Sequence, residues 1–303
     1  MINNILITGA NGQDGKIILK KLLKKRINLF LISKKFENKI QKKNIKYFEF
    51  NLNKKKKLEK FFKNYKIDII LHLASNNPGY RQNNFKKHYL ENINISKNII
   101  NFSIKNNNKI KFISCSSSRV FKKKNIVNEN SKLFASDFYG KFRIDIYNYL
   151  NQIKKVNKKF NFINVILFNH DSIYRNERFL LPRIISAIIK KDKKFLNEII
   201  KENISMDYSH ADDICNGLVK IIFNKNKIKN IILSSGKKTY INDLIKFLFK
   251  KNNINMKLNY KNVKKSHCVI GKNKFAKKIL NWKLRKDIYI AAQEMFKIIN
   301  KNN

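Results

Sequence analysis

Residues 5–15 read ILITGANGQDG, an apolar run followed by three glycines spaced three residues apart. Gly9, Gly12 and Gly15 lie between a strand-like segment and a helix-like segment that begins near residue 13. Such a turn needs residues without side chains, because its backbone must approach a pyrophosphate held at the positive N-terminus of the helix. The stretch therefore predicts a dinucleotide-binding loop, with a plain tight turn as the alternative.

The segments that follow keep the same order of strand and helix. Apolar runs at 4–8, 29–33, 47–50, 67–74, 110–117 and 162–168 predict strands, and amphipathic spacing at 13–26, 55–65, 85–106 and 138–156 predicts helices. Buried strands separated by helices are typical of a doubly wound parallel sheet. We expect an α/β fold with a Rossmann-type domain over residues 1–168. Residues 169–303 should form mainly a smaller, mixed α/β substrate lobe, with some segments returning to the first domain.

The charge of the chain is extreme but widely spread. Of 303 residues, 67 are Lys or Arg and 20 are Asp or Glu, giving a formal net charge of +47. Lysines occur in every segment and arginines are few, so we expect a solvated surface and no specific nucleic-acid partner. Three separate cysteines without a C-x-x-C pair predict neither a disulfide framework nor a metal site. The lack of a signal-peptide pattern and of a membrane-length apolar run predicts a cytoplasmic protein.

The residues after the second predicted strand bear on the choice of cofactor. An acidic side chain there would bind the adenosine ribose of NAD, but this chain has Ser33, Lys34 and Lys35. The two cations favour the 2′-phosphate of NADP, and the alternative is that they are only solvated lysines in a lysine-rich chain. We expect NADP, with NAD less favoured.

The stretch YGKFR, residues 139–143, places Tyr139 and Arg143 one turn apart on one face of a predicted helix. At that spacing the cation can stabilise the tyrosine phenolate and reach a bound cofactor. The pair is therefore a candidate for acid–base chemistry beside the predicted dinucleotide site.

Together with ITGANGQDG and the serines at 116–118, this pair resembles the extended short-chain dehydrogenases, the NAD-dependent epimerase/dehydratase family. FNHDSIYRNERF (168–179) is similar to the F-N-H-E-S-P-R-R-G-E-x-F signature of GDP-mannose 4,6-dehydratases, and NENSKLFASDFY (128–139), DYSHADD (207–213) and AKKILNW (276–282) follow further motifs in register. The resemblance spans nearly the whole chain. It implies a homo-oligomer acting on a nucleotide sugar, either GDP-mannose or a GDP-keto-deoxy sugar.

The resemblance also implies roles for individual residues. Tyr139 would be the acid–base group, Ser117 would orient the sugar hydroxyl, and Arg143 would be the electrostatic partner. His170 would face the cofactor, although a histidine at a strand end is often only a hydrogen-bonded structural group. The residues expected to bind the cofactor are Gly9, Asn11, Gly12, Gln13, Asp14, Gly15, Lys34, Lys35, Asn51, Leu52, Leu73, Ala74, Tyr139, Arg143 and His170. Those expected to bind the substrate are Ser117, Asn169, Arg175 and Arg178.

Three departures from the dehydratase pattern leave three hypotheses open. Arg119 stands where those enzymes have a glutamate that removes the C5 proton, and an arginine cannot act as that base. Arg143 replaces a lysine, and Met206 replaces an arginine. The chain could be a dehydratase-like enzyme with an altered elimination step, a 4-keto-sugar reductase or epimerase, or a non-catalytic paralogue that binds the cofactor.

Overall fold

A parallel sheet of seven strands forms the centre of the computed structural model, which describes residues 3–81, 85–122, 126–261 and 263–301. Its strand order is β10-β7-β5-β4-β1-β2-β3, so the chain winds outward in both directions from β1. The strands are β1 (Asn4–Thr8), β2 (Asn28–Ser33), β3 (Ile45–Glu49), β4 (Ile69–His72), β5 (Lys111–Ser117), β7 (Asn161–Leu167) and β10 (Asn230–Leu233). This confirms the doubly wound α/β fold expected from the sequence.

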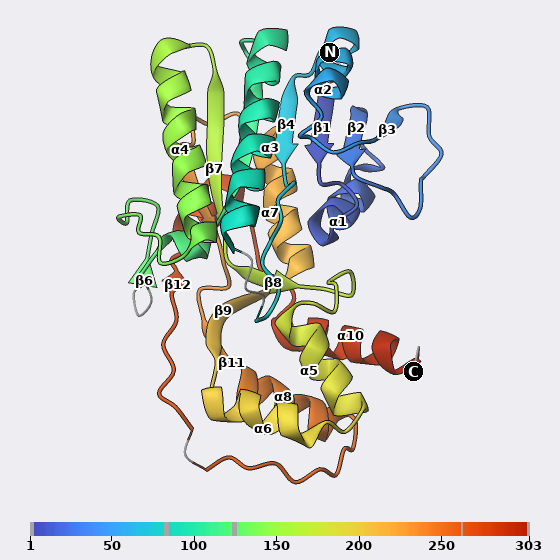
Figure 1. Ribbon diagram of the computed structural model, residues 1–303, viewed down its shortest axis with the longest axis vertical. Coiled ribbons are helices and arrows are strands. Elements are labelled where there is room, and N and C mark those ends of the chain that lie inside the picture. Colours follow the sequence, from blue (N-terminus) through green and yellow to red (C-terminus); the bar gives the residue numbers. More distant parts are fainter. Residues whose placement is uncertain (1–2, 82–84, 123–125, 262, 302–303) are drawn as a thin grey trace.

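Helices cover both faces of the sheet (Figure 1). One face packs against α2 (Lys55–Asn64), α3 (Phe85–Asn106) and α4 (Phe138–Val156), and the other against α1 (Gln13–Leu22), α7 (Ala211–Phe223) and α9 (Lys274–Leu280). Side chains alternate along each strand, so Ile5 and Ile7 join one core and Leu6 joins the other. The near-continuous apolar runs in the sequence follow from this two-sided burial.

Helix α1 ends at Leu22, although its amphipathic spacing predicted a helix to residue 26. A backbone hydrogen bond from Lys25 to Leu22 and another from Ile27 to Lys25 turn the chain there. The turn brings Ile27 into the core and starts β2, so the demand to bury an apolar residue ends the helix early.

Most of the elements that follow β7 form a second lobe. It contains α5 (Leu180–Ile189), α6 (Lys193–Glu202), α8 (Ile241–Lys251) and α10 (Ile288–Lys301), which share one apolar core. Its three-stranded sheet has β9 (Ser205–His210) between β8 (Asn169–Asp171) and β11 (Lys238–Tyr240), and a short pair joins β6 (Ile126–Val127) to β12 (Ile270–Gly271). Helix α7, β10 and α9 return to the large sheet, and the domain division at residue 168 stays a prediction.

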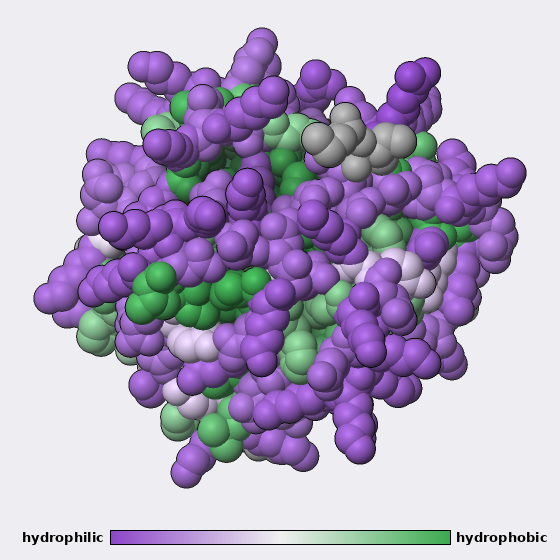
Figure 2. Space-filling view, turned by 90° about the horizontal axis from the view of Figure 1, so that it is seen from above, coloured by the Kyte–Doolittle hydropathy of each residue, from purple (hydrophilic) through white to green (hydrophobic). Residues whose placement is uncertain are grey.

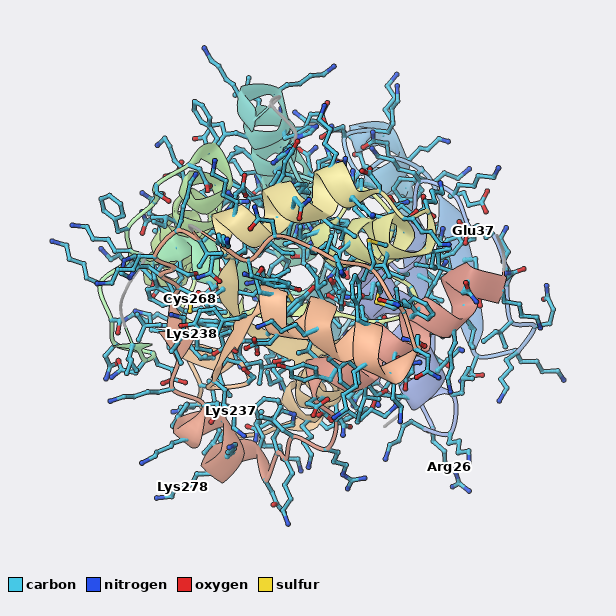
Figure 3. The ribbon with its side chains drawn as sticks, turned by 90° about the horizontal axis from the view of Figure 1, so that it is seen from below. Arg26, Glu37, Lys237, Lys238, Cys268 and Lys278 are labelled. Carbon is cyan, nitrogen blue, oxygen red and sulfur yellow. The ribbon has the colours of Figure 1, made fainter. Side chains whose placement is uncertain are left out.

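The surface is hydrophilic over most of the face in Figure 2. Seen from the opposite side, lysines such as Lys237 and Lys278 extend outward from the ribbon (Figure 3). Across the described residues, no helix is long and apolar enough to cross a membrane, and no cluster of His, Cys, Asp and Glu could hold a metal ion.

Candidate active site

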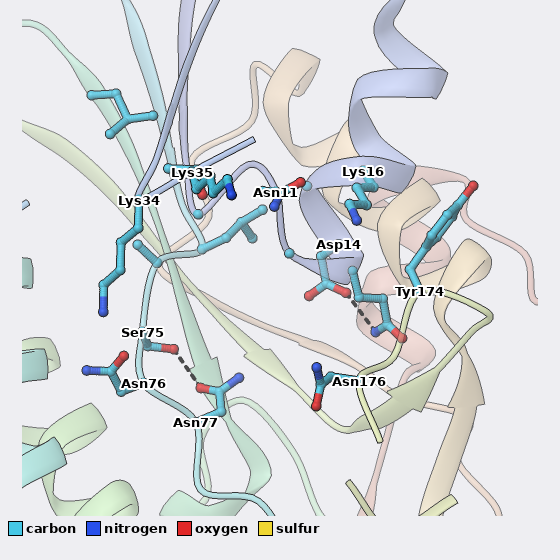
Figure 4. Close-up of a pocket in the computed structure, with 18 of the residues that line it drawn as sticks. Asn11, Asp14, Lys16, Lys34, Lys35, Ser75, Asn76, Asn77, Tyr174 and Asn176 are labelled. Atoms are coloured by element: carbon cyan, nitrogen blue, oxygen red, sulfur yellow. Dashed lines mark hydrogen bonds between the residues drawn. The ribbon is translucent and has the colours of Figure 1, made fainter. Parts of the chain in front are cut away.

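A cavity of about 530 Å³ opens at the carboxyl ends of β1, β2 and β4 (Figure 4). Ligands of open α/β sheets bind at this edge, where the winding direction of the sheet reverses. Lys34 and Lys35 line the cavity after β2, on the side away from Tyr174. Most of the residues that we expect to bind the cofactor line this cavity. They are Gly9, Asn11, Gly12, Gln13, Asp14, Gly15, Lys34, Lys35, Asn51, Leu52, Leu73 and Ala74. Their roles in binding stay predictions.

Two glycines of the loop are required by its close packing. Gly9 has a φ of +70°, and a Cβ there would lie 2.9 Å from the Ala74 backbone. A Cβ on Gly15 would lie 2.4 Å from the carbonyl oxygen of Ala10. The loop is therefore pressed between the ends of the strands and the first turn of α1, which leaves its open side toward the cavity.

A second cavity of about 220 Å³ adjoins the first, and Asp14, Ser75, Asn77 and Arg175 line both. It lies at the ends of β5 and β7, beside β8 of the second lobe. The remaining predicted site residues on its walls are Ser117, Tyr139, Arg143, Asn169 and His170. The structure thus brings the two groups of sequence motifs together, while Arg178, an exposed residue, lines only the first cavity.

Tyr139 is fixed at the start of α4 by a ring of hydrogen bonds. Its hydroxyl donates to Oδ1 of Asn77 at 2.7 Å, and Ser75 donates to the same oxygen at 2.6 Å. Nη2 of Arg143 closes the ring, 2.7 Å from the Tyr139 hydroxyl and 3.0 Å from Oγ of Ser75. Oδ1 of Asn77 thus accepts the hydrogen bond of the phenol, and the guanidinium of Arg143 stabilises negative charge that develops on the phenol oxygen.

The guanidinium of Arg143 is held by hydrogen bonds from two of its nitrogens. Arg143 is 8% exposed, and its Nη1 donates to the carbonyl of Cys115 on β5. Three hydrogen bonds therefore fix the plane of the guanidinium, with one of them directed at Tyr139. Sequence reasoning missed Ser75 and Asn77, whose only signal is a short polar run that starts three residues after the end of β4.

Arg119 lies in a short 3-10 turn after β5 (Ser118–Val120) and braces the beginning of α4. Its Nε and Nη2 donate to Oδ2 of Asp137 at 2.8 and 2.6 Å, while Oδ1 of Asp137 caps α4 by accepting from the Gly140 amide at 2.8 Å. A Cβ on Gly140 would lie 2.5 Å from the Arg119 carbonyl, so this approach requires glycine. Ser117 accepts from the Arg119 amide at 3.3 Å, which places its hydroxyl at the edge of the second cavity.

Two carboxylates line the second cavity among the described residues, and both are engaged. Asp14 lies 3.1 Å from Nε2 of His170, and Asp171 accepts from Arg175 and from the buried hydroxyl of Tyr208. Although burial acts in the opposite direction, Asp171 and Asp14 raise the pKa of Arg175. Neither carboxylate is therefore free to take a proton from a substrate carbon.

Two motifs distant in sequence are joined directly. Oε1 of Gln13, in the glycine loop, accepts from the amide and hydroxyl of Ser172 at 2.9 and 3.1 Å. Next to it, Asp14 pairs with His170, whose Nδ1 contacts the carbonyl of Phe168 at 2.6 Å. Both nitrogens of His170 face acceptors, so the ring fits this place as an imidazolium. His170 reaches the cofactor loop through Asp14, a contact that the sequence pattern did not specify.

The Asp14–His170 pair predicts a defined pH dependence of stability. Burial opposes ionisation of both groups, yet Asp14 raises the pKa of His170 above 6.5 and His170 holds the pKa of Asp14 below 3.8. A raised histidine pKa contributes stability below 6.5 that is lost as pH rises through the folded-state value. A lowered aspartate pKa contributes stability above 3.8 that is lost as pH falls. The contribution of the pair should therefore be largest between pH 3.8 and 6.5.

We expect the free-energy difference between the wild type and His170→Gln, measured by urea unfolding, to be largest near pH 5.5 and smaller at pH 8.5. The free-energy difference between the wild type and Asp14→Asn should likewise be smaller at pH 8.5 than at pH 5.5, because this variant lacks the carboxylate that keeps His170 charged. His72 would not confuse the comparison, since burial and Arg143 lower its pKa to about 3 and it is present in all three proteins. A difference independent of pH would mean that the pKa of His170 is the same in the folded and unfolded protein, and a difference that falls below pH 6.5 would mean that His170 stays neutral when folded.

Several solved enzymes share this fold over their whole length. UDP-glucose 4-epimerase from Thermotoga maritima superposes with a TM-score of 0.81 and 17% identity, covering 99% of both chains. The UDP-Glc/GlcNAc 4-epimerase of Campylobacter jejuni gives 0.81 and 18%, over 99% of this chain and 100% of that one. The dTDP-glucose 4,6-dehydratase of Bacillus anthracis, in complex with NAD, gives 0.80 and 13%, over 99% and 97%.

A search of curated proteins found no match to the chain, but a search of family profiles did. The profile of the NAD dependent epimerase/dehydratase family matches residues 5–233, which include the glycine loop, the Tyr139–Arg143 pair and the link between Gln13 and Ser172. The chain therefore belongs to the NAD-dependent epimerase/dehydratase family.

Proposed function

We propose that this protein is an NADP-dependent enzyme that oxidises and reduces the C4 position of a nucleotide sugar. The observation that carries the proposal is the Tyr139–Arg143 contact of 2.7 Å, where the predicted cofactor cavity meets a second, polar cavity. The family and the similar solved enzymes support a nucleotide-sugar substrate.

Each residue of the site has a step that its contacts support. Tyr139 removes the proton from the C4 hydroxyl and later returns it, while Arg143 stabilises the phenolate. Ser117 orients that hydroxyl from the end of β5. NADP, when bound in the first cavity, supplies the hydride acceptor. Asn77 holds the phenol hydroxyl before substrate enters, so it keeps Tyr139 in place in the free protein.

The choice of NADP rests on the cations around the adenosine end of the first cavity. Lys34 and Lys35 are exposed and line it, and no salt bridge engages either one among the described residues. The nearby Glu37 is bound by Lys16 at 2.7 Å, which lowers the pKa of Glu37 and keeps that carboxylate charged and occupied. Two free ammonium groups would pair with a 2′-phosphate.

We assign the substrate diphosphate to Arg178, which lines the first cavity and not the second, and the sugar to Asn169 in the second cavity. Arg178 is the less engaged of the two arginines expected there, because Arg175 is paired with Asp171. The sequence resemblance supports a GDP sugar, whereas the similar solved enzymes named above act on UDP or dTDP sugars. The resemblance also supports a homo-oligomer, and the cysteine content and the lack of a signal-peptide pattern support a cytoplasmic location.

The second cavity favours C4 epimerisation or ketone reduction over loss of water. Elimination of a C6 hydroxyl needs a base for the C5 proton, and such a positioned base contributes about 10²- to 10⁴-fold in rate. Here Arg119 and Asp137 form an ion pair at that place, and the carboxylates on the cavity wall are engaged. The dehydratase reading of the resemblance would require another group to take this role.

Mass spectrometry in deuterated water tests this function. The purified protein is incubated with NADP and, separately, with GDP-mannose, UDP-glucose and UDP-glucuronate. A C4 epimerase moves hydride through the cofactor, so we expect a product of unchanged mass and altered chromatographic mobility, without solvent deuterium. Loss of one water with uptake of deuterium would overturn the proposal in favour of dehydration. Bound cofactor with no conversion of any sugar would favour either a reductase, which needs NADPH and a 4-keto sugar, or the non-catalytic paralogue.

A further inference from the structure

Three arginines line the second cavity, and the side chains of two of them are largely shielded from solvent. Arg175 is buried against Asp171, and Arg143 lies behind Tyr139 with its donors on Cys115 and Ser75. Arg119 differs, because 45% of its side chain is exposed while it lines this cavity. It also lines only this cavity, whereas Arg175 lines both.

The contacts of Arg119 leave one edge of its guanidinium open. Asp137 takes Nε and Nη2 through a single oxygen, and Nη1 has no hydrogen-bond partner among the residues that the structure describes. The guanidinium carbon is 5.9 Å from the centre of the Tyr139 ring. Since Asp137 is itself fixed by the Gly140 amide, the guanidinium is held in one orientation near the Tyr139 ring.

A brace for α4 would not need an arginine that faces a cavity. The Gly140 amide is already capped by Asp137, and a side chain that only supported this cap could lie outside the cavity. An open guanidinium edge is instead suited to a planar anion, which it can bind with two parallel hydrogen bonds. A group next to the C4 hydroxyl of a bound sugar would meet that edge.

We propose that Arg119 binds a carboxylate on the sugar, so that the substrate is a nucleoside diphosphate uronic acid. The C6 carboxylate of such a sugar is attached to C5, the neighbour of the C4 carbon that carries the reacting hydroxyl. This inference rests on the function proposed above and names its substrate class. It also accounts for the missing base, because a C6 carboxylate has no hydroxyl to lose as water. Arg119 then selects the substrate while Tyr139 acts on it.

Matched ligands that differ only at C6 test the inference. Calorimetric titration with UDP-glucose and UDP-glucuronate, and with GDP-mannose and GDP-mannuronate, gives dissociation constants without turnover when no cofactor is added. We expect one uronate to bind at least about tenfold more tightly than its neutral partner, the scale of one charge-assisted hydrogen-bond pair. Arg119→Met should lose this preference and leave the neutral sugar within about twofold.

Two further variants separate binding from structure. Asp137→Asn keeps an oxygen to cap Gly140 but removes the charge that partly neutralises Arg119, so the preference for the uronate should be kept or increased. Arg81→Met is the matched control, because Arg81 is also 45% exposed and paired with carboxylates, Glu198 and Glu202, but lines neither cavity. It should change none of the dissociation constants.

Three outcomes would count against the inference. Equal binding of uronate and neutral sugar by the wild type would overturn it and leave the proposed function standing. An equal weakening of both ligands in Arg119→Met would assign Arg119 a structural role only. Binding of none of the four ligands would overturn the proposed function, and the inference with it.

Discussion

Replacing Tyr139 by phenylalanine is expected to lower kcat for C4 chemistry by about 10²- to 10⁴-fold, the usual effect of losing a positioned acid–base group. The ring stays against Phe142, but its hydroxyl no longer exchanges a proton with the sugar. Arg143 keeps its bonds to Cys115 and Ser75, so its position should hold. Steady-state turnover and the dissociation constant for NADP, measured together, should show a loss of turnover much larger than any loss of cofactor affinity, to which Tyr139 would contribute one hydrogen bond.

Tyr89→Phe is the control for this experiment. The Tyr89 hydroxyl, on α3, donates to Asp145 of α4 at 2.7 Å and lies outside both cavities. Its loss should leave turnover within about twofold, with only the stability change of one hydrogen bond, about 1 kcal/mol. Turnover by Tyr139→Phe at the wild-type rate would show that another group transfers the proton.

The double substitution Lys34→Ala and Lys35→Ala is expected to weaken NADP binding by about 10- to 100-fold and to leave NAD binding unchanged. The two cofactors differ by one phosphate, and hydrogen bonds to a charged group contribute about 1.5–3 kcal/mol. Because both lysines are exposed, the effect should shrink as ionic strength rises. Fluorescence titration with each reduced cofactor at low and high salt measures this difference.

Two exposed lysines outside the cavities provide the comparison. Lys55 and Lys56 begin α2, so their replacement by alanine removes the same formal charge from the molecule. If both double variants weaken NADP equally, the general field of a highly basic protein attracts the cofactor and no specific phosphate site is formed. Equal affinity of the wild type for NAD and NADP would contradict the proposed preference.

The site depends on how the two lobes are joined. Gln13 and Asp14 belong to the glycine loop, while His170 and Ser172 belong to the segment that enters the second lobe. A cofactor on this loop and a sugar beside Asn169 would therefore meet across one hydrogen-bonded junction. This arrangement ties the position of the loop to the entrance of the substrate lobe.

Much of the fold was predictable because its signals are local. Strands buried on both faces need unbroken apolar runs, helices on a sheet need amphipathic spacing, and the loop needs glycine at positions 9 and 15. The Tyr139–Arg143 pair was also predictable, since one helical turn separates the residues. The return of β10 to the edge of the large sheet carried no comparable signal, because a short apolar strand fits either lobe.

The sequence by itself therefore determined the doubly wound sheet, the position of the glycine loop and the neighbouring tyrosine and arginine, because each depends on spacing within one or two elements. Only the tertiary structure decided which polar groups complete the site. Asn77 contacts Tyr139, which is 62 residues away in the sequence, and Asp14 contacts His170, which is 156 residues away. Asp137 forms an ion pair that fixes Arg119 beside the second cavity. Such contacts form where strand ends converge in space, and no local periodicity encodes which ends will meet.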